Sequence, residues 1–225
     1  VATQSFTIAV ANVNDAPTIT SSEVTSATED SAYTYTLTTN DVDSGDTVTL
    51  AATTLPSWLS FDTTTGVLSG TPGNDDVGNH DVVLTATDTS NAVATQSFTI
   101  AVANVNDAPT AANNTVTTVE DTAHTFASSE FNFSDVDSGD SLSSITIKTL
   151  PAAGTLALSG SAVSANDVIN TADISNLTFT PAANASGTGY ASFTFSVSDG
   201  TASSASDYTM TVNVTAANDA PTITS

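Results

Sequence analysis

An exact internal repeat is the feature that most constrains the fold of this chain. The segment VATQSFTIAVANVNDAPT occupies residues 1–18 and returns unchanged at residues 93–110. A shorter echo, NDAPTITS, closes the chain at residues 218–225 and repeats residues 14–21. Similarity at a regular spacing is the signature of modules arranged in tandem. The spacing between the three NDAP motifs predicts domains of about 100 residues each.

These repeats predict where the domains begin and end. We expect residues 1–14 to be the last strand and linker of a preceding repeat, and residues 15–107 to form the first domain. Residues 108–218 would form the second domain, and residues 219–225 would begin a following repeat.

The apolar residues in both halves alternate with polar ones. This period of two is typical of half-buried β-strands, because successive side chains point to opposite faces. No long stretch has the helical period, and turn signals such as DSGD and SDG separate the runs. The sequence therefore predicts an all-β chain of two tandem antiparallel β-sandwiches with Greek-key topology. The expected buried positions are Tyr33, Tyr35, Leu37, Val82, Leu84, Ala86, Phe98, Ile100, Val102, Phe193, Phe195, Val197, Tyr208, Met210, Val212 and Val214.

The charge balance excludes several kinds of partner. The chain has 24 acidic residues and one basic residue, Lys148, for a formal net charge of −23. Such a surface repels nucleic acid and anionic membranes and attracts cations. No apolar run is long enough to span a bilayer, and there is no cysteine for a disulfide framework. We therefore expect no nucleic-acid partner and no membrane insertion.

The motif DVDSGD occurs once in each half, at residues 41–46 and 135–140. In an extended segment its first and third carboxylates share a face, which suits a hard cation such as Ca²⁺. It is not an EF-hand loop, because Gly is fifth and the twelfth positions are Ala52 and Thr146. The alternative is a simple turn, since Asp accepts local backbone hydrogen bonds.

Two longer motifs carry a resemblance to known families. LPSWLSFDTTTGVLSGTP at residues 55–72, with the closing VNDAP, resembles a cadherin-like domain of the dystroglycan type. LPAAGTLAL at 150–158 and ISNLTFTPAANASGTGYASFTFSVSDG at 174–200 resemble the cadherin-like, immunoglobulin-like repeats of bacterial tandem arrays. Such repeats occur in large secreted bacterial adhesins, in polysaccharide-degrading enzymes and in eukaryotic surface proteins.

The resemblance implies Ca²⁺ at the junctions between successive domains, held by oxygen ligands from both domains and from the linker. For the complete junction the matching residues are Glu29, Asp75, Asp76, Asn104, Asn106, Asp107, Asp135, Asp137 and Asp199. For the junction before the first domain they are Asn12, Asn14, Asp15, Asp41, Asp43 and Asp88. For the junction after the second domain they are Glu120, Asn218 and Asp219.

We expect a structural extender of a calcium-dependent surface adhesin, extracellular or on the cell surface, that serves cell adhesion and biofilm formation. Its partners would be neighbouring repeats of the same chain, with extracellular polysaccharide or another surface protein as further candidates. We expect no enzymatic activity, because His80 and His124 lie in unrelated strand contexts. The alternative is a carbohydrate-binding accessory module of a secreted polysaccharide-acting protein, with Trp58 as the candidate sugar contact.

Overall fold

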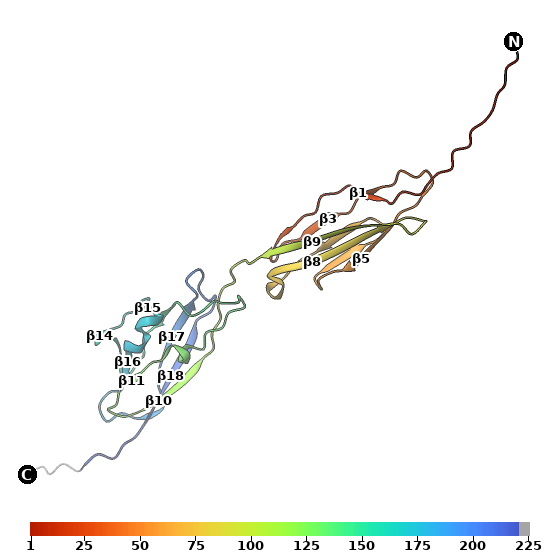
Figure 1. Cartoon of the computed structure of the whole chain (residues 1–225). Helices are drawn as coiled ribbons and strands as arrows, with labels where there is room; N and C mark the ends of the chain where they lie inside the picture. The colour runs from red at the N-terminus through yellow and green to blue at the C-terminus, as the bar shows by residue number, and fades with distance from the viewer. Residues whose placement is uncertain (221–225) are drawn as a thin grey trace, which may run out of the picture. The chain divides into compact units, whose positions relative to one another are not determined.

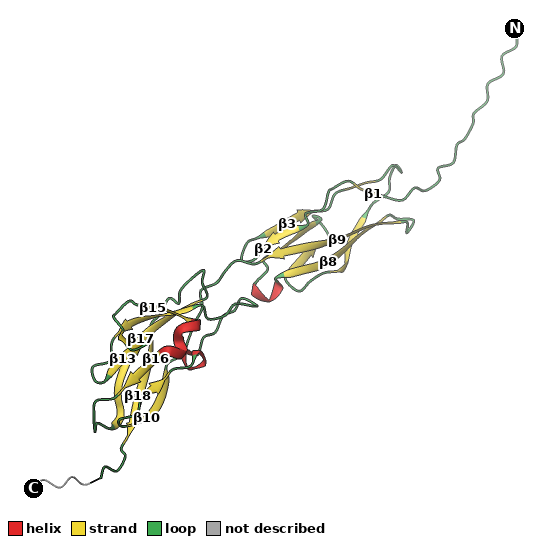
Figure 2. Ribbon diagram, turned by 60° about the vertical axis from the view of Figure 1, so that its left-hand side comes forward, coloured by secondary structure: helices red, strands yellow, loops and turns green. Residues whose placement is uncertain are grey.

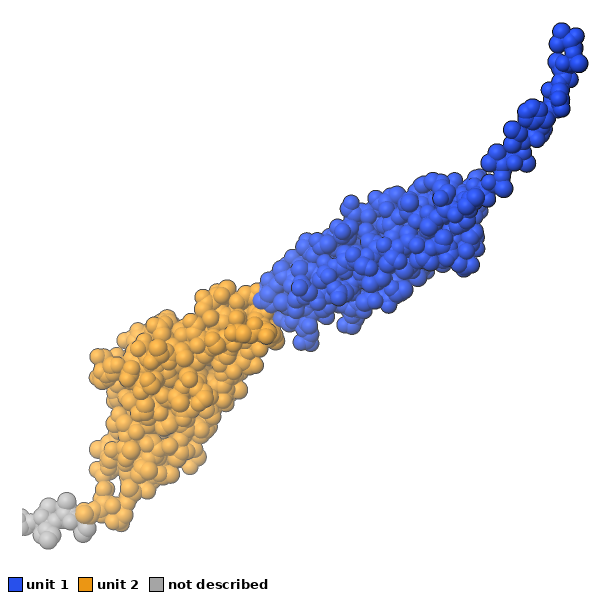
Figure 3. Space-filling model, viewed as in Figure 1, with its two compact units in different colours: residues 1–105 blue, residues 106–225 orange. Residues whose placement is uncertain are grey.

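The computed structural model describes residues 1–220, so part of the predicted segment 219–225 lies outside the described residues. Contacts divide the chain after Val105 into two compact units (Figures 1 and 3). Unit 1 runs from Val1 to Val105, and unit 2 begins at Asn106. Strands dominate both units, and the helices are short 3₁₀ turns (Figure 2).

Unit 1 is a sandwich of two main sheets. One sheet has the strand order β2-β9-β8-β5 and the other β3-β7-β6, with a short β1-β4 pair beside them. The elements are β1 (Thr18–Ile19), β2 (Ser26–Thr28), β3 (Tyr33–Thr36), β4 (Thr39–Asn40), β5 (Thr49–Thr54), β6 (Leu59–Asp62), β7 (Val67–Gly70), η1 (Asn74–Asp76), β8 (Gly78–Thr87) and β9 (Val93–Ala103).

Unit 2 is also a sandwich of two sheets. Their strand orders are β10-β18-β17-β12-β15 and β11-β16-β13-β14. The elements are β10 (Asn114–Val119), β11 (His124–Thr125), η2 (Ser128–Phe131), β12 (Ser144–Thr149), β13 (Thr155–Leu158), β14 (Ser161–Ala162), β15 (Val168–Asn170), η3 (Thr171–Asn176), β16 (Leu177–Thr180), β17 (Gly187–Ser198) and β18 (Tyr208–Thr215).

The sandwiches are antiparallel except for one strand pair in each unit. In unit 1, β2 lies parallel to β9, and in unit 2, β10 lies parallel to β18. In each case an early strand of the unit therefore lies beside its last strand and runs in the same direction. In unit 2 the parallel ladder covers the last six residues of β18, whereas in unit 1 β2 lies beside only the last three residues of β9.

The alternating residues form two separate cores, as the sequence predicted. In unit 1, Leu84 and Ile100 are fully buried, and in unit 2, Phe193 and Phe195 are fully buried. Aromatic rings fill much of the second core, with Phe131 and Phe195 in edge-to-face contact at 4.9 Å between ring centroids. Each such side chain contributes about 2 kcal/mol through removal of apolar surface from water.

The repeated sequence adopts two different states within unit 1. Residues 93–103 form β9, in which Phe98, Ile100 and Val102 face the core. The identical residues 1–11 form no strand and are exposed along their length. Their Phe6, Ile8 and Val10 side chains, which match the three core residues of β9, are 78%, 73% and 89% exposed.

Gly154 explains why the LPAAGTLAL segment needs glycine at its fifth position. Its φ of +72° lies in the left-handed region. A Cβ atom there would lie 2.5 Å from Cζ of Phe179 and 2.7 Å from the carbonyl oxygen of Thr180. Both the backbone conformation and the packing therefore favour glycine. Gly160 has a similar φ of +81°, but nothing lies within 4 Å of the Cβ that it would carry.

We expect Gly154→Ala to destabilise unit 2 more than the matched control Gly160→Ala. The control has only the left-handed backbone penalty, about 1–2 kcal/mol. Gly154→Ala adds overpacking against Phe179, about 1–3 kcal/mol more. Scanning calorimetry of the two variants measures the difference in the unit 2 transition, and equal losses would contradict the packing argument.

Candidate metal centres

The DVDSGD motif folds into a tight acidic turn in unit 1. The backbone N–H of Asp43 donates to Oδ1 of Asp41 at 2.9 Å, and the N–H of Asp46 donates to the carbonyl of Asp43 at 3.3 Å. Gly45 permits the turn with a φ of +96°. These local bonds are those of a turn, and they leave oxygens of Asp41 and Asp46 for other contacts.

The motif in unit 2 repeats the same bonds. The N–H of Asp137 donates to Oδ1 of Asp135 at 3.0 Å, and the N–H of Asp140 donates to the carbonyl of Asp137 at 3.3 Å. Gly139 has a φ of +103°. The same six letters therefore give the same turn in two separate sandwiches.

The linker before β1 is hydrogen-bonded to the acidic turn of unit 1. The side-chain amide of Asn12 donates to Oδ1 of Asp43 at 2.7 Å, and the N–H of Asp15 donates to Oδ2 of Asp43 at 2.7 Å. The amide of Asn14 donates to Oδ2 of Asp88 at 2.9 Å. The linker residues thus lie against the acidic end of the sandwich that they precede.

Unit 2 has the equivalent contacts. The N–H of Asp107 donates to Oδ2 of Asp137 at 2.6 Å, and the amide of Asn106 donates to Oδ2 of Asp199 at 3.1 Å. Oδ1 of Asp199 accepts the N–H groups of Thr201 and Ala202 at 2.5 and 2.7 Å. Asp88, which follows β8, and Asp199, which follows β17, are therefore each held by their own loop and by the preceding linker.

Each unit brings three carboxylates together in what we call its acidic triad. The first acidic triad consists of Asp41, Asp46 and Asp88, and the second of Asp135, Asp140 and Asp199. Within each triad, one carboxylate oxygen from each residue lies within 4.8 Å of the others. Seven further predicted ligands are joined to these triads by the hydrogen bonds just given, directly or through Asp43 and Asp137: Asn12, Asn14, Asp15, Asp43, Asn106, Asp107 and Asp137.

Several oxygens of the triads, and one of the neighbouring Asp137, have neither solvent nor a hydrogen-bond donor. The buried Oδ2 atoms of Asp41, Asp46 and Asp135 have no hydrogen-bond partner, and neither does Oδ1 of Asp137. Two carboxylates at this separation repel by about 3 kcal/mol at an effective dielectric near 20. The only Lys or Arg in the chain is Lys148, and unit 1 contains none.

The pKa values reflect this arrangement of charges and donors. Partial burial raises the pKa of Asp140, and the neighbouring carboxylates of Asp135, Asp137 and Asp199 raise it further. The Asn14 amide, followed by backbone N–H groups, lowers the pKa of Asp88 against the opposing effect of burial. Asp88 therefore stays ionised to lower pH, whereas Asp140 gains protons more readily.

The pKa of Asp199 is lowered although desolvation acts in the opposite direction. Desolvation is the largest single contribution and raises the pKa. The backbone N–H groups of Ala202 and Thr201 and then the Asn106 amide together outweigh it. The second triad thus combines one carboxyl of raised pKa with one of lowered pKa.

The donor set of both triads fits Ca²⁺. All of the candidate ligand atoms are oxygens, and several of them are buried without a partner. Ca²⁺ takes six to eight oxygen ligands in a tolerant geometry, whereas Zn²⁺ prefers nitrogen and sulfur ligands. A divalent cation would also offset the mutual repulsion of the carboxylates.

The glutamates predicted as ligands lie at the other end of their units. Glu29 follows β2 and accepts the N–H of Val105 at Oε2, 3.1 Å away, while its buried Oε1 has no hydrogen-bond partner. Glu120 follows β10 and accepts the N–H of Ala217 at Oε1, 2.6 Å away. They are 1% and 7% exposed. Each glutamate is therefore tied to the segment that leaves the last strand.

The third NDAP motif begins with the same local bond as the other two. The Asn218 amide donates to the carbonyl of Asp219 at 3.2 Å, as Asn14 does to Asp15 and Asn106 to Asp107. Asn104 is exposed at the end of unit 1.

The structure places Asp75 and Asp76 in η1, outside both acidic triads. Oδ2 of Asp76 accepts the N–H of Gly73 at 3.0 Å, and Asp75 is exposed.

The sequence analysis missed Asp46 and Asp140, which belong to the triads. The signal was present, because both are the last letter of the repeated DVDSGD motif.

The histidines have structural partners. His80 Nε2 lies 2.7 Å from the carbonyl oxygen of Asp76, and its ring contacts the edge of Trp58. Trp58 also packs edge-to-face against Tyr33, which places its ring against the core of unit 1. The residue considered for sugar contact is thus part of the packing.

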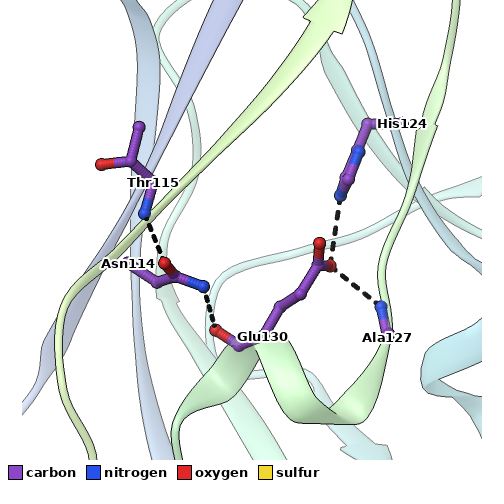
Figure 4. A network of polar contacts seen from close by, with 5 residues as sticks. All are labelled: Asn114, Thr115, His124, Ala127 and Glu130. Carbon is purple, nitrogen blue, oxygen red and sulfur yellow. Dashed lines mark hydrogen bonds and ion pairs between the residues drawn. The ribbon is translucent and has the colours of Figure 1, made fainter.

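His124 belongs to a polar network that ties β11 and β10 to η2 (Figure 4). Its Nε2 lies 3.2 Å from Oε2 of Glu130, which also accepts the N–H of Ala127 at 3.0 Å. The Asn114 amide donates to the backbone carbonyl of Glu130 at 2.8 Å. These hydrogen bonds join β10, β11 and η2, so His124 and Glu130 have a structural role in holding the three elements together.

Comparison with known proteins agrees with this architecture. Residues 16–103 match the family described as "Putative Ig domain", and residues 106–215 match the family described as "Bacterial Ig domain". The chain is therefore a tandem of immunoglobulin-like repeats with cadherin-like structure. Domains of this class are generally non-catalytic and typically occur in surface or secreted proteins. No curated protein matches the chain.

Cadherin ectodomains are among the similar solved structures. Human mucin-like protocadherin EC1-2 is 19% identical with a TM-score of 0.56, over 89% of this chain and 98% of that one. Protocadherin gamma B2 EC1-5 is 19% identical with a TM-score of 0.60, over 92% of this chain and 41% of that one. This likeness concerns the fold. Within residues 1–220, no helix has the length and apolar character needed to cross a bilayer.

We expect Asn14→Ala to raise the pKa of Asp88 toward the usual value of about 3.9. The Asn14 amide is the largest cause of the lowered pKa. A lowered folded-state pKa contributes stability above the unfolded value and loses it as pH falls through the folded value. The variant should therefore lose part of that contribution at neutral pH. Carboxyl NMR titration in chelator measures the change.

The matched control is Asn106→Ala, which should move Asp199 and leave Asp88 unchanged. The change in the pKa of Asp199 should be smaller than the change at Asp88, because backbone N–H groups lower the pKa of Asp199 more than the Asn106 amide does. An unchanged Asp88 titration in Asn14→Ala would show that the linker amide does not set its pKa.

Proposed function

We propose that this chain is a non-catalytic extender of an extracellular surface adhesin, and that its acidic triads bind Ca²⁺. The observation that carries the proposal is the recurrence of one hydrogen-bonded carboxylate arrangement in two sandwiches. Asp41, Asp46 and Asp88 of unit 1 correspond to Asp135, Asp140 and Asp199 of unit 2. A DVDSGD motif that served only as a turn would not require the same hydrogen-bond donors from the linker in both units.

The negative charge of the triads supports the proposal that they bind a cation. Each triad gathers three carboxylates, and no Lys or Arg of unit 1 can balance the first. The buried oxygens without partners are available as ligands. In this proposal Asp43 and Asp137 position the linker as well as offering ligand oxygens, because their carboxylates accept the linker N–H groups.

The linker contacts suggest what the metal would do. Asn14 and Asn106 each bond to a triad carboxylate, so an ion held there would fix the linker against the sandwich that follows it. A glutamate of the preceding repeat, such as Glu29 or Glu120, would add a further oxygen. Neighbouring repeats would then be restrained relative to each other, which suits a spacer that carries an adhesive domain away from a cell.

We expect calorimetric titration to show Ca²⁺ binding at least about tenfold tighter than Mg²⁺ binding, because a loose all-oxygen site suits the larger ion. Asp41→Asn with Asp46→Asn should remove the binding event of unit 1. Asp135→Asn with Asp140→Asn should remove that of unit 2.

The control for lost charge is Asp173→Asn with Asp207→Asn, two exposed acids outside the triads. This variant should titrate like the wild type. Absence of heat with Ca²⁺ in the wild type, or equal losses in the control, would refute the metal site.

We expect Ca²⁺ to narrow the distribution of shapes that small-angle scattering records for the whole chain. Units joined by a short linker move relative to each other by default, and a shared metal would restrict that motion. Asp135→Ala with Asp137→Ala should respond much less, while both sandwiches stay folded by circular dichroism. A wild type whose scattering is the same in chelator and in Ca²⁺ would contradict the restraint, even if calorimetry shows binding.

A further inference from the structure

Unit 2 has a groove that the candidate metal sites do not use. Its volume is about 590 Å³, which lies within the range of roughly 300–1,000 Å³ typical of pockets for small ligands. The groove is formed by η2, the segment between η2 and β12, and the first residue of η3. None of the residues that line it is a candidate metal ligand. They are Ser128, Ser129, Asn132, Phe133, Ser141, Leu142 and Thr171.

The base of the groove is apolar. Phe133 and Leu142 line the groove and also pack against the core of unit 2. Both side chains are half-buried, so each keeps a part of its surface accessible. An accessible aromatic ring can stack against an apolar face of a ligand.

The other side chains of the groove are polar, and most of them lack a partner. The hydroxyls of Ser128, Ser129 and Ser141 and the side-chain amide of Asn132 make no hydrogen bond within residues 1–220. Oγ1 of Thr171 donates to the carbonyl of Leu142 at 2.5 Å, and its oxygen can still accept a hydrogen bond. Hydroxyl and amide groups both donate and accept. The groove therefore suits a ligand that carries many hydroxyl groups.

The walls of the groove are fixed by the surrounding structure. The polar network around Glu130 holds η2 in place (Figure 4). The N–H of Thr171 donates to the carbonyl of Ser143 at 2.9 Å, and the N–H of Ser143 donates to the carbonyl of Ser198 at 2.7 Å. Asn132 ends η2 with a φ of +45°. A site that is already ordered loses little conformational freedom when a ligand binds.

The absence of charge in the groove narrows the class of ligand. None of the seven lining residues is acidic or basic, although the chain contains 24 acidic residues. Residues 135–140, the acidic turn of unit 2, lie between Phe133 and Ser141 in the sequence. The field of these carboxylates repels anionic ligands. The ligand that fits is therefore neutral as well as rich in hydroxyl groups.

We propose that this groove binds a short stretch of a neutral glycan. A pyranose ring has an apolar C–H face and a rim of hydroxyl groups. Phe133 contacts the apolar face, while Asn132, Ser141 and the serines of η2 pair with the hydroxyls. Glycans that carry uronic acids or sulfate are disfavoured. The groove is distinct from Trp58, and glycan binding there does not depend on the proposed metal sites or on the proposed role as an extender.

The test titrates the full ¹⁵N-labelled chain with cellohexaose, laminarihexaose, mannohexaose and N-acetylchitohexaose, both with Ca²⁺ and in chelator. We expect at least one of these neutral probes to shift the amide signals of residues 128–133, 141–142 and 171 in either condition. Oligogalacturonate, an anionic probe, should leave them unchanged. The proposal is wrong if no neutral probe shifts these signals, if the shifts are confined to unit 1 around Trp58, or if oligogalacturonate binds more tightly.

Variants of the groove decide whether these side chains bind the probe. Asn132→Gly with Ser141→Ala removes an amide and a hydroxyl, and glycine keeps the left-handed backbone. The Kd of the tightest neutral probe should rise at least about fivefold. Phe133→Leu keeps an apolar side chain and should also weaken binding, by about threefold or more.

The matched control is Asn166→Gly with Ser206→Ala. Asn166 has a φ of +71°, and both residues are exposed and outside the groove. The control should bind as tightly as the wild type, and the thermal transition of unit 2 shows that each variant is folded. Equal affinity of the control and the Asn132→Gly, Ser141→Ala variant would overturn the proposal, whatever Phe133→Leu does to stability.

Discussion

Repulsion between the carboxylates of each acidic triad is the main physical constraint on the end of each sandwich that contacts the preceding linker. Each unit holds three acids within 4.8 Å of one another, and the chain supplies a single Lys to oppose 24 acidic groups. The protein reduces this repulsion with neutral donors, namely the amides of Asn14 and Asn106 and the N–H groups of the linkers. These donors are also what ties each linker to its sandwich. A cation bound as proposed would reduce the same repulsion that the linker donors reduce.

The sequence predicted those features of the fold that depend on a single physical rule. Alternation placed Leu84, Ile100 and Phe195 in the cores, because one face of each strand must be buried. The parallel pairing of β2 with β9 and of β10 with β18 was not predicted, since alternation is the same for either strand direction.

The candidate site was predicted in part. Asp41, Asp88, Asp135 and Asp199 were singled out as ligands, and the structure gathers them into the triads. Asp46 and Asp140 were missed, because reasoning from an extended segment paired the first and third acids of DVDSGD. The turn at Gly45 brings the last acid of the motif to the cluster instead. Whether a metal binds there depends on oxygens contributed by distant segments, which spacing along the chain does not specify.

The parallel pairing of early and last strands has a mechanical consequence. A pull on the two ends of unit 2 would load the β10–β18 ladder along the strands, so its hydrogen bonds resist together and do not open one after another. That ladder joins six residues of each strand, whereas the β2–β9 ladder joins three. Under tension the two units would therefore differ in strength, and unit 1 would yield first and act as the extensible element of the pair.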